Sequence, residues 1–261
     1  ALAVAGITVA ALYGCYQGYV GVAVVPSQQD MALNAGMPGR VYSFFDNPNN
    51  FAELLVMLIP LDLALLTNVK GWRARIGCLF SLAVCVAAIG LTYGRSSWLG
   101  LALAVVVFLG LVNWRFIPVL IVLGLCAVPL LPQTIYNRLL TLGNTQEDSS
   151  VQYRFSIYRS TFQLLKDHWL RGVGLDTDVV QAVFRANYPP MFNGAYPIHT
   201  HNNYLQMWVE TGIIGALAYI ALLLHQLKTG VKSVLACADH RIKRMLAASV
   251  GGLCGILLTS V

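Results

Sequence analysis

The stretch LFSLAVCVAAIGLTYGRSSWLGLALAVVVFLGLVNWRFIPVLIVLGLCAVPLL, residues 79–131, decides the fold class of this chain. Its only charged residues are Arg95 and Arg115, which divide it into three uncharged runs. Each run approaches or reaches the roughly 20 apolar residues that a helix needs to cross the hydrocarbon core of a bilayer. The stretch therefore predicts three membrane-spanning helices joined by two short turns.

The same pattern extends outward in both directions. The 261 residues are 57% hydrophobic and 11% charged, whereas a soluble domain carries about 25% charged residues. We therefore predict an all-α integral membrane protein with about seven transmembrane helices. Their approximate ranges are 1–25, 51–69, 76–93, 97–113, 116–132, 204–226 and 245–261.

This pattern divides the chain into three parts. Residues 1–132 hold five transmembrane helices with short loops, residues 133–203 form one large loop, and residues 204–261 hold two further transmembrane helices. Because the sequence starts and stops inside apolar runs, we expect a fragment of a larger polytopic protein. No signal peptide is predicted.

The distribution of charge indicates an orientation. The formal net charge is +6, but nine cations against one acid, Asp239, fall in three connections predicted on one side. These cations are Lys70, Arg73, Arg75, Arg115, Lys228, Lys232, Arg241, Lys243 and Arg244. An excess of Lys and Arg marks cytoplasmic loops. The charge therefore indicates a lipid bilayer and no nucleic acid, and it puts residues 26–50, 93–96 and 133–203 outside.

The large outer loop contains one predicted helix. Apolar residues recur at helical spacing over 151–169, with Arg154, Arg159 and Lys166 between them. This spacing is typical of an amphipathic helix that lies in the membrane interface. The segment Arg171–Gly174 ends the helix, since glycine is the usual helix stop.

Three outer-face residues are candidates for chemistry. Arg95 lies in the tight turn after the third span, and its planar guanidinium suits a phosphate or pyrophosphate. It is equally explained as an interfacial anchor. His201 opens the sixth span and could accept a proton near neutral pH, although such a histidine is more often structural. His199 and His201 have no neighbouring carboxylate or third histidine, so we expect no metal.

Other polar residues have simpler explanations. Asp176-Thr177-Asp178 matches the D-x-D of metal-dependent sugar transferases, but three-residue matches are common by chance. Asp62 and Glu210 lie within apolar spans, where ionisable residues are functional candidates by default. Glu210 could equally contact Asn203 or Gln206, and Gly212 and Gly215 could allow close helix packing. The six cysteines lack close spacing, so neither a disulfide framework nor a zinc site is predicted.

Taken together, four motifs resemble the O-antigen ligase-like family. They are Arg40–Asn50, Gly94–Leu101, Tyr153-Arg154-Phe155 with Trp169–Gly174, and His199–Leu205 with Glu210–Gly215. The resemblance covers most of the chain and keeps the order of the motifs. The H-x-H-N-x-Y-L…E-x-G-x-x-G run is the most specific of them.

The resemblance implies a metal-independent glycosyltransferase of the bacterial inner membrane, without a cofactor. Such enzymes move a glycan from a polyprenyl-pyrophosphate carrier to an acceptor hydroxyl, on a glycan, lipid or protein, at the extracytoplasmic face. By motif position, Arg95 and Arg154 engage the pyrophosphate. Either His199 or His201 prepares the acceptor, and His201-Asn202 is the better match to the family's H-N. The residues expected to bind substrate are Arg40, Arg159, His199, Asn202, Tyr204 and Glu210.

Two other classes of protein compete with this hypothesis. A transporter or flippase for a lipid-linked glycan could use the same arginines, but transporters often show inverted repeats and broken helices near the midplane. The sequence indicates neither feature. A non-catalytic membrane scaffold would leave the Arg and His residues of the outer loop unexplained.

Overall fold

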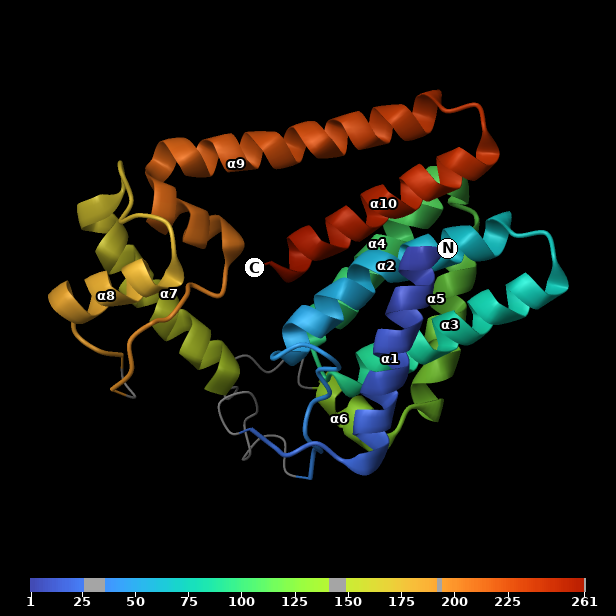
Figure 1. The fold of residues 1–261 in the computed structure, drawn as a ribbon, viewed down its shortest axis with the longest axis horizontal. Coiled ribbons are helices and arrows are strands. Elements are labelled where there is room, and N and C mark those ends of the chain that lie inside the picture. The colour runs from blue at the N-terminus through green and yellow to red at the C-terminus, as the bar shows by residue number, and fades with distance from the viewer. Residues whose placement is uncertain (26–35, 141–148, 192–193, 261) are drawn as a thin grey trace. The chain divides into compact units, whose positions relative to one another are not determined.

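The computed structural model describes residues 1–25, 36–140, 149–191 and 194–260, and every regular element within these ranges is helical. Figure 1 shows the helices in chain order. The first six are α1 (Leu2–Val20), α2 (Pro48–Asn68), α3 (Trp72–Leu91), α4 (Arg95–Asn113), α5 (Phe116–Ala127) and, after a 3₁₀ turn η1 (Val128–Leu130), α6 (Gln133–Leu140). The others are α7 (Ser149–His168), α8 (Thr177–Asn187), α9 (Asn203–Ala236) and α10 (His240–Thr259).

The chain divides into two compact units. The first unit comprises residues 1–143 and 227–259, and the second comprises residues 144–226 with 260–261. The predicted boundaries at 132 and 203 therefore do not coincide with the units. Residues 203–226, about two thirds of α9, belong with the loop before it rather than with the final helix.

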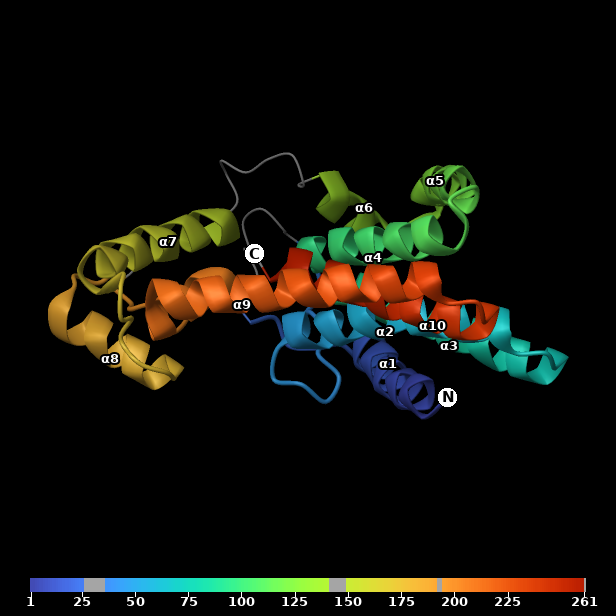
Figure 2. The same ribbon diagram turned by 90° about the horizontal axis from the view of Figure 1, so that it is seen from above.

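The first unit is a bundle whose core lies between α1, α2, α3 and α4. Phe51, Leu55 and Cys85 are fully buried there. The helix α10 packs against α2 and α4, and the three run alongside one another in Figures 1 and 2. Glycines make this contact close, since a Cβ at Gly252 would meet the carbonyl oxygen of Met57 at 2.6 Å. Small residues at such contacts are typical of helix packing in membranes.

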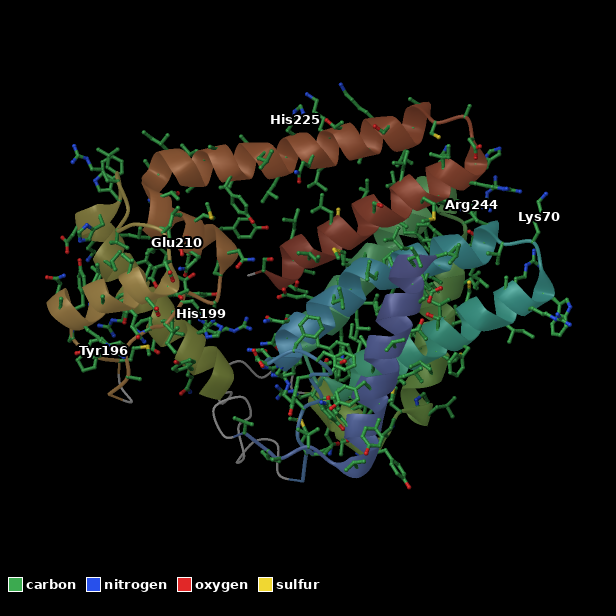
Figure 3. The ribbon with its side chains drawn as sticks, in the orientation of Figure 1. Lys70, Tyr196, His199, Glu210, His225 and Arg244 are labelled. Atoms are coloured by element: carbon green, nitrogen blue, oxygen red, sulfur yellow. The ribbon has the colours of Figure 1, made fainter. Side chains whose placement is uncertain are left out.

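Two of the cationic connections meet at one end of the first unit. Asn68 Nδ2 donates to the Arg241 carbonyl at 3.1 Å, and Arg244 Nη1 donates to the Thr67 carbonyl at 2.8 Å. Lys70 and Arg244 are seen at this end in Figure 3. The predicted common side of the 70–75 and 241–244 segments is therefore supported, while its assignment to the cytoplasm stays a prediction. Lys228 and Lys232 lie within α9, not in a connection.

Fewer helices than predicted meet the requirements of a membrane span. Among the described residues, α2, α3, α4, α9 and α10 are long and apolar enough, and α5 with α6 could be a sixth span, bent by 119°. The chain is thus a multi-pass membrane protein with five or six candidate spans. The span predicted over 116–132 corresponds to α5 and η1, and the chain bends at its end, where Pro132 precedes α6. The helix α1, 19 residues long, is not among the candidates; Tyr16, Gln17 and Tyr19 make its second half too polar.

The second unit contains more helix than the sequence predicts for this loop. The helix expected over 151–169 is α7, but α8 was not predicted. Leu164, Val180, Phe184 and Val209 form a core between α7, α8 and the start of α9. Phe155 and Phe162 lie on the opposite, exposed side of α7. This arrangement suits an amphipathic helix at a membrane surface, and that location stays a prediction.

Candidate active site

Three arginines surround the turn between α3 and α4 in the first unit. Arg95 is the first residue of α4. Arg40 Nε donates to the Thr92 carbonyl at 2.6 Å, and the buried Arg138 has its Nε 3.5 Å from the Tyr93 carbonyl. We call Arg40, Arg95, Arg138 and the Thr92–Gly94 segment the arginine turn. It concentrates permanent positive charge at the amino end of α4, which itself favours anions.

The local backbone explains why these groups meet. The helix α3 ends at Leu91 and leaves carbonyl groups without helical partners, which guanidinium groups commonly satisfy. Tyr93 adopts φ 51° and so reverses the chain within a few residues. Arg40 Nη2 also donates to Asn49 Oδ1 at 2.6 Å, which ties the turn to the first turn of α2. A Cβ at Gly94 would lie 3.5 Å from Arg40 Nη2, so the motifs Arg40–Asn50 and Gly94–Leu101 adjoin each other.

Arg138 is the member of the arginine turn that the sequence did not identify. It lies in α6, beyond the bend at Pro132. Because Arg138 is far from Arg95 in the sequence, no residue spacing indicates that the two lie close together. A charged residue close after an apolar run looks like an ordinary membrane boundary. Only the reversal of α6 against the α3–α4 turn reveals the contact.

The second unit holds the two histidines in one loop before α9. His199 Nε2 lies 3.2 Å from His201 Nδ1, and the ring centroids are 4.0 Å apart. The edge of the Tyr153 ring lies toward His201, with centroids 6.3 Å apart. Arg154 is close enough that its charge acts on the His201 imidazole. We call Arg154, His199 and His201 the histidine cluster; His199 is labelled in Figure 3.

Hydrogen bonds fix the shape of this loop. Asn202 Oδ1 accepts from the backbone N–H groups of Tyr204 and Leu205, each at 3.0 Å, and so caps the amino end of α9. The Thr200 hydroxyl donates to the Asn202 carbonyl at 2.7 Å. His201 adopts φ 51°, a conformation uncommon for a residue with a side chain. The hydrogen bonds of Thr200 and Asn202, the residues on either side, therefore hold His201 in an otherwise unfavourable backbone geometry.

A chain of side-chain contacts continues from the loop into α9. The Thr200 N–H donates to Gln206 Oε1 at 2.8 Å, and Gln206 Nε2 donates to Glu210 Oε1 at 2.8 Å. The predicted contact between Glu210 and Gln206 is confirmed. Tyr204 lies against Tyr219, with ring centroids 6.3 Å apart. Asn202 and Glu210 thus have clear structural roles, and their binding of substrate stays a prediction.

Burial and neighbouring charge set the protonation of the histidines. Burial, followed by the charges of His199 and Arg154, lowers the pKa of His201 to about 4. Burial also lowers the pKa of His199. Both imidazoles are therefore neutral at physiological pH. In the hydrogen bond between them one ring donates and the other accepts, so the donating ring keeps a free nitrogen that can accept a proton.

A break in α9 holds its first turns against the segment after α7. Gly212 has φ 72° and ψ −177°, a backbone geometry open essentially to glycine alone. The carbonyls of Val209 and Glu210, which the break frees, accept from Val173 N at 2.8 Å and Gly174 N at 3.1 Å. Ile213 N donates in turn to the Trp169 carbonyl at 2.9 Å.

Two glycines make this contact possible. A Cβ at Gly172 would lie 2.6 Å from the Glu210 carbonyl oxygen, and a Cβ at Gly212 would strike the backbone of Leu170 and Arg171. We call Gly172 with Gly212 the glycine contact. The close packing predicted for Gly212 is thus real, but its partner is a loop and not a helix. The contact positions the histidine loop on the carboxyl end of α7.

The D-x-D match has a structural explanation. Asp176 is the N-cap of α8, and its carboxylate accepts from the Asp178 N–H at 3.2 Å. Within the described ranges, no group of three or more His, Cys, Asp or Glu side chains is placed to hold a metal ion. These acids therefore mark the start of α8. Metal independence itself stays a prediction.

The predicted residues thus fall into two groups. Arg40 and Arg95 meet in the arginine turn, whereas Arg154, His199 and His201 meet in the histidine cluster of the other unit. The convergence of Arg95 with Arg154 and His201 stays a prediction. Arg159 lies on α7 beside a cavity that is described below.

Comparison with known proteins agrees with these motifs. A family model described as O-antigen ligase (Wzy_C) matches residues 80–220. The match runs from the second half of α3 past the break in α9, and so includes Arg95, Arg154, both histidines and the glycine contact. The comparison with curated proteins finds no match. The matched region is more than half of the 261 residues, and the chain belongs to the O-antigen ligase family.

Proposed function

We propose that this protein transfers a glycan from a polyprenyl-pyrophosphate carrier to an acceptor hydroxyl, at the extracytoplasmic face of the bacterial inner membrane. The family implies a lipid-linked glycan and an acceptor as substrates. The observation that carries the proposal is the histidine cluster. It pairs a neutral imidazole, which can take a proton, with a guanidinium, which can hold an anion.

The chemistry assigns one task to each kind of group. The acceptor oxygen attacks the anomeric carbon and its proton passes to a ring nitrogen of His201. The bond between the anomeric carbon and the pyrophosphate oxygen breaks, and the carrier leaves with the electron pair. Arg95 and Arg154 stabilise the negative charge that develops there, with Arg40 and Arg138 adding to the field around Arg95. His199 orients the His201 ring through the contact between their nitrogens.

Donor binding would also strengthen the base. The low pKa of His201 arises partly from the charge of Arg154. A pyrophosphate bound to Arg154 offsets that charge, so the pKa of His201 rises toward its ordinary value. The imidazole then holds the proton of the acceptor more readily when the donor is present than when it is absent.

One observation favours a second candidate, a transporter for the lipid-linked glycan. The sequence indicates no broken helix, yet α9 is broken at Gly212, and broken helices are typical of transporter binding sites. The break lies in the third turn of the helix, however, and its freed carbonyls are bonded to residues 173 and 174. It therefore has backbone partners of its own and does not require an ion or substrate.

Reconstituted full-length protein distinguishes the two candidates. Proteoliposomes that contain the lipid-linked glycan should form transferred product, and the Arg95→Ala/His201→Ala double variant should form none. The matched control is Arg185→Ala/His225→Ala, which removes an arginine and a histidine from outside both clusters. Normal transfer by the first double variant would overturn the proposal. Movement of the lipid-linked glycan across the bilayer without transfer would favour the transporter.

A further inference from the structure

A cavity of about 460 Å³ lies against α7 in the second unit. The side chains of Ser156, Arg159, Ser160 and Gln163 line it from α7, together with Phe155. The segment Pro189–Met191, which follows α8, lines the other side. Its volume is in the range of small-molecule sites in proteins. None of the roles proposed above uses it.

Polar side chains of α7 make up much of the lining of this cavity. The Ser160 side chain is only 9% exposed, and its hydroxyl has no hydrogen-bond partner among the described residues. The side chains of Arg159 and Gln163 are exposed and also line the cavity. Buried polar groups are normally hydrogen-bonded. The Ser160 hydroxyl, on a residue that is otherwise buried, is therefore available to a polar ligand in the cavity.

The helix geometry connects the cavity to the histidine cluster. Tyr153, Ser156, Ser160 and Gln163 recur at spacings of three and four residues, so they lie on one face of α7. Tyr153 contacts His201, and the Ser156 hydroxyl donates to the Tyr153 carbonyl at 2.7 Å. From Tyr153 to Ser160 the helix rises by about 10 Å. The cavity therefore begins about one helical turn from the residue that touches His201.

The chemistry of the lining suits a carbohydrate. Serine hydroxyls and the glutamine amide both donate and accept hydrogen bonds, as sugar hydroxyls require of their partners, while Arg159 adds donors. Phe155 and the two prolines offer apolar surface for the C–H face of a sugar ring. We propose that this cavity is a sugar subsite, which holds the acceptor glycan while its reacting hydroxyl lies at His201. This inference rests on the proposed function and adds a binding site to it.

The first test measures binding without catalysis. Full-length protein in detergent is titrated with the soluble repeat-unit oligosaccharide released by mild acid from the surface polysaccharide of the host, and contact is followed by saturation-transfer NMR. Arg159→Gln/Gln163→Ala should weaken binding about tenfold or more, as expected for the loss of two hydrogen-bonding partners. His201→Ala should bind as the wild type does. Equal binding by the wild type and the Arg159→Gln/Gln163→Ala variant would overturn the subsite.

A matched control comes from α8. Gln181 and Arg185 are four residues apart like Arg159 and Gln163, and they line a separate hollow on the same unit. Gln181→Ala/Arg185→Gln should leave binding unchanged. If this variant weakens binding and the α7 variant does not, the sugar lies on α8 and the inference is wrong.

A third variant guards against an effect on folding. Ser160→Ala removes only the unpartnered hydroxyl and leaves the packing of α7 intact. It should raise the KM for the acceptor roughly two- to tenfold, with kcat little changed. An unchanged KM would contradict the inference. Oligosaccharide that binds in this way but is never transferred would instead refute the proposed function and leave the subsite standing.

Discussion

The arginine turn and the histidine cluster both hold cationic groups in place, but they differ in what those groups can do. Arg40, Arg95 and Arg138 surround one helix junction and keep their charge at any physiological pH. The histidine cluster sets a single arginine beside two imidazoles that burial keeps neutral. The first region can only bind and stabilise an anion, whereas the second can also receive a proton. The division matches the two demands of glycosyl transfer, a stabilised leaving group and a deprotonated acceptor.

The largest effect should come from the proton acceptor. His201→Ala should lower glycan transfer about 10²- to 10⁴-fold, the usual range for a general base. Binding of the lipid-linked donor, measured on the same protein by filter binding, should change little. His199→Ala should be milder, because it removes only the neighbour that orients the ring. Equal losses in the two variants would show that the two histidines share one role.

Replacing the guanidinium of the arginine turn should cost almost as much. Arg95→Lys should lose about 10²- to 10³-fold in transfer, nearly the loss of Arg95→Ala, because an ammonium cannot reproduce a planar bidentate donor. Lys166→Ala, on the exposed side of α7, provides the control. Retention of most activity by Arg95→Lys would mean that the turn supplies charge alone.

Disturbing the glycine contact should have an intermediate effect. Gly212→Ala places a Cβ against the Leu170–Arg171 backbone at a φ that costs of the order of 1–3 kcal/mol for other residues. We expect a lower midpoint of thermal unfolding and about a tenfold loss of transfer, as the histidine loop shifts. Gly110→Ala on α4 is the control, because a Cβ at that position would meet nothing within 4 Å. Normal unfolding and normal transfer by Gly212→Ala would show that the break in α9 does not position the histidine loop.

The two regions should respond differently to pH. The pKa of His201 is about 4 in the free protein, so kcat/KM should fall only as pH approaches 4 from above. Donor bound at Arg154 raises that pKa, so kcat should fall at a higher pH. Arg154→Gln removes one cause of the low pKa of His201. The acid limb of the kcat/KM profile should therefore move to higher pH. Identical acid limbs for kcat and kcat/KM would disprove the link between donor and base.

The smallest effect should follow removal of the acids at the start of α8. Asp176→Asn keeps an N-cap acceptor, and Asp178→Asn keeps the shape of the side chain, so stability should change by less than about 1 kcal/mol. Transfer by both variants and by the wild type in EDTA should remain near normal. Activity that EDTA abolishes and divalent ions restore would make the D-x-D motif a metal site.

Features that depend on neighbouring residues were predicted from the sequence. Features that depend on contacts between distant segments were not. Arg95 at a helix start, the helix stop at Gly172 and the contact of Gln206 with Glu210 all depend on neighbouring residues. The break at Gly212 does not, because it needs the 169–174 segment to bind the freed carbonyls, and a glycine in an apolar run looks like continuous helix. Arg138 was missed for a similar reason, since only the bend before α6 brings it to Tyr93.

The packing of α10 has a consequence for how the protein is made. The glycines of this helix pack closely on α2 and α4, yet the ribosome synthesises it only after the whole segment that forms the second unit. During translation, α2, α3 and α4 must therefore wait in the membrane with that surface uncovered, exposed to lipid or to an insertion factor. A nascent chain arrested before residue 240 should be the species that quality-control proteases recognise, and release of the arrest should make it resistant.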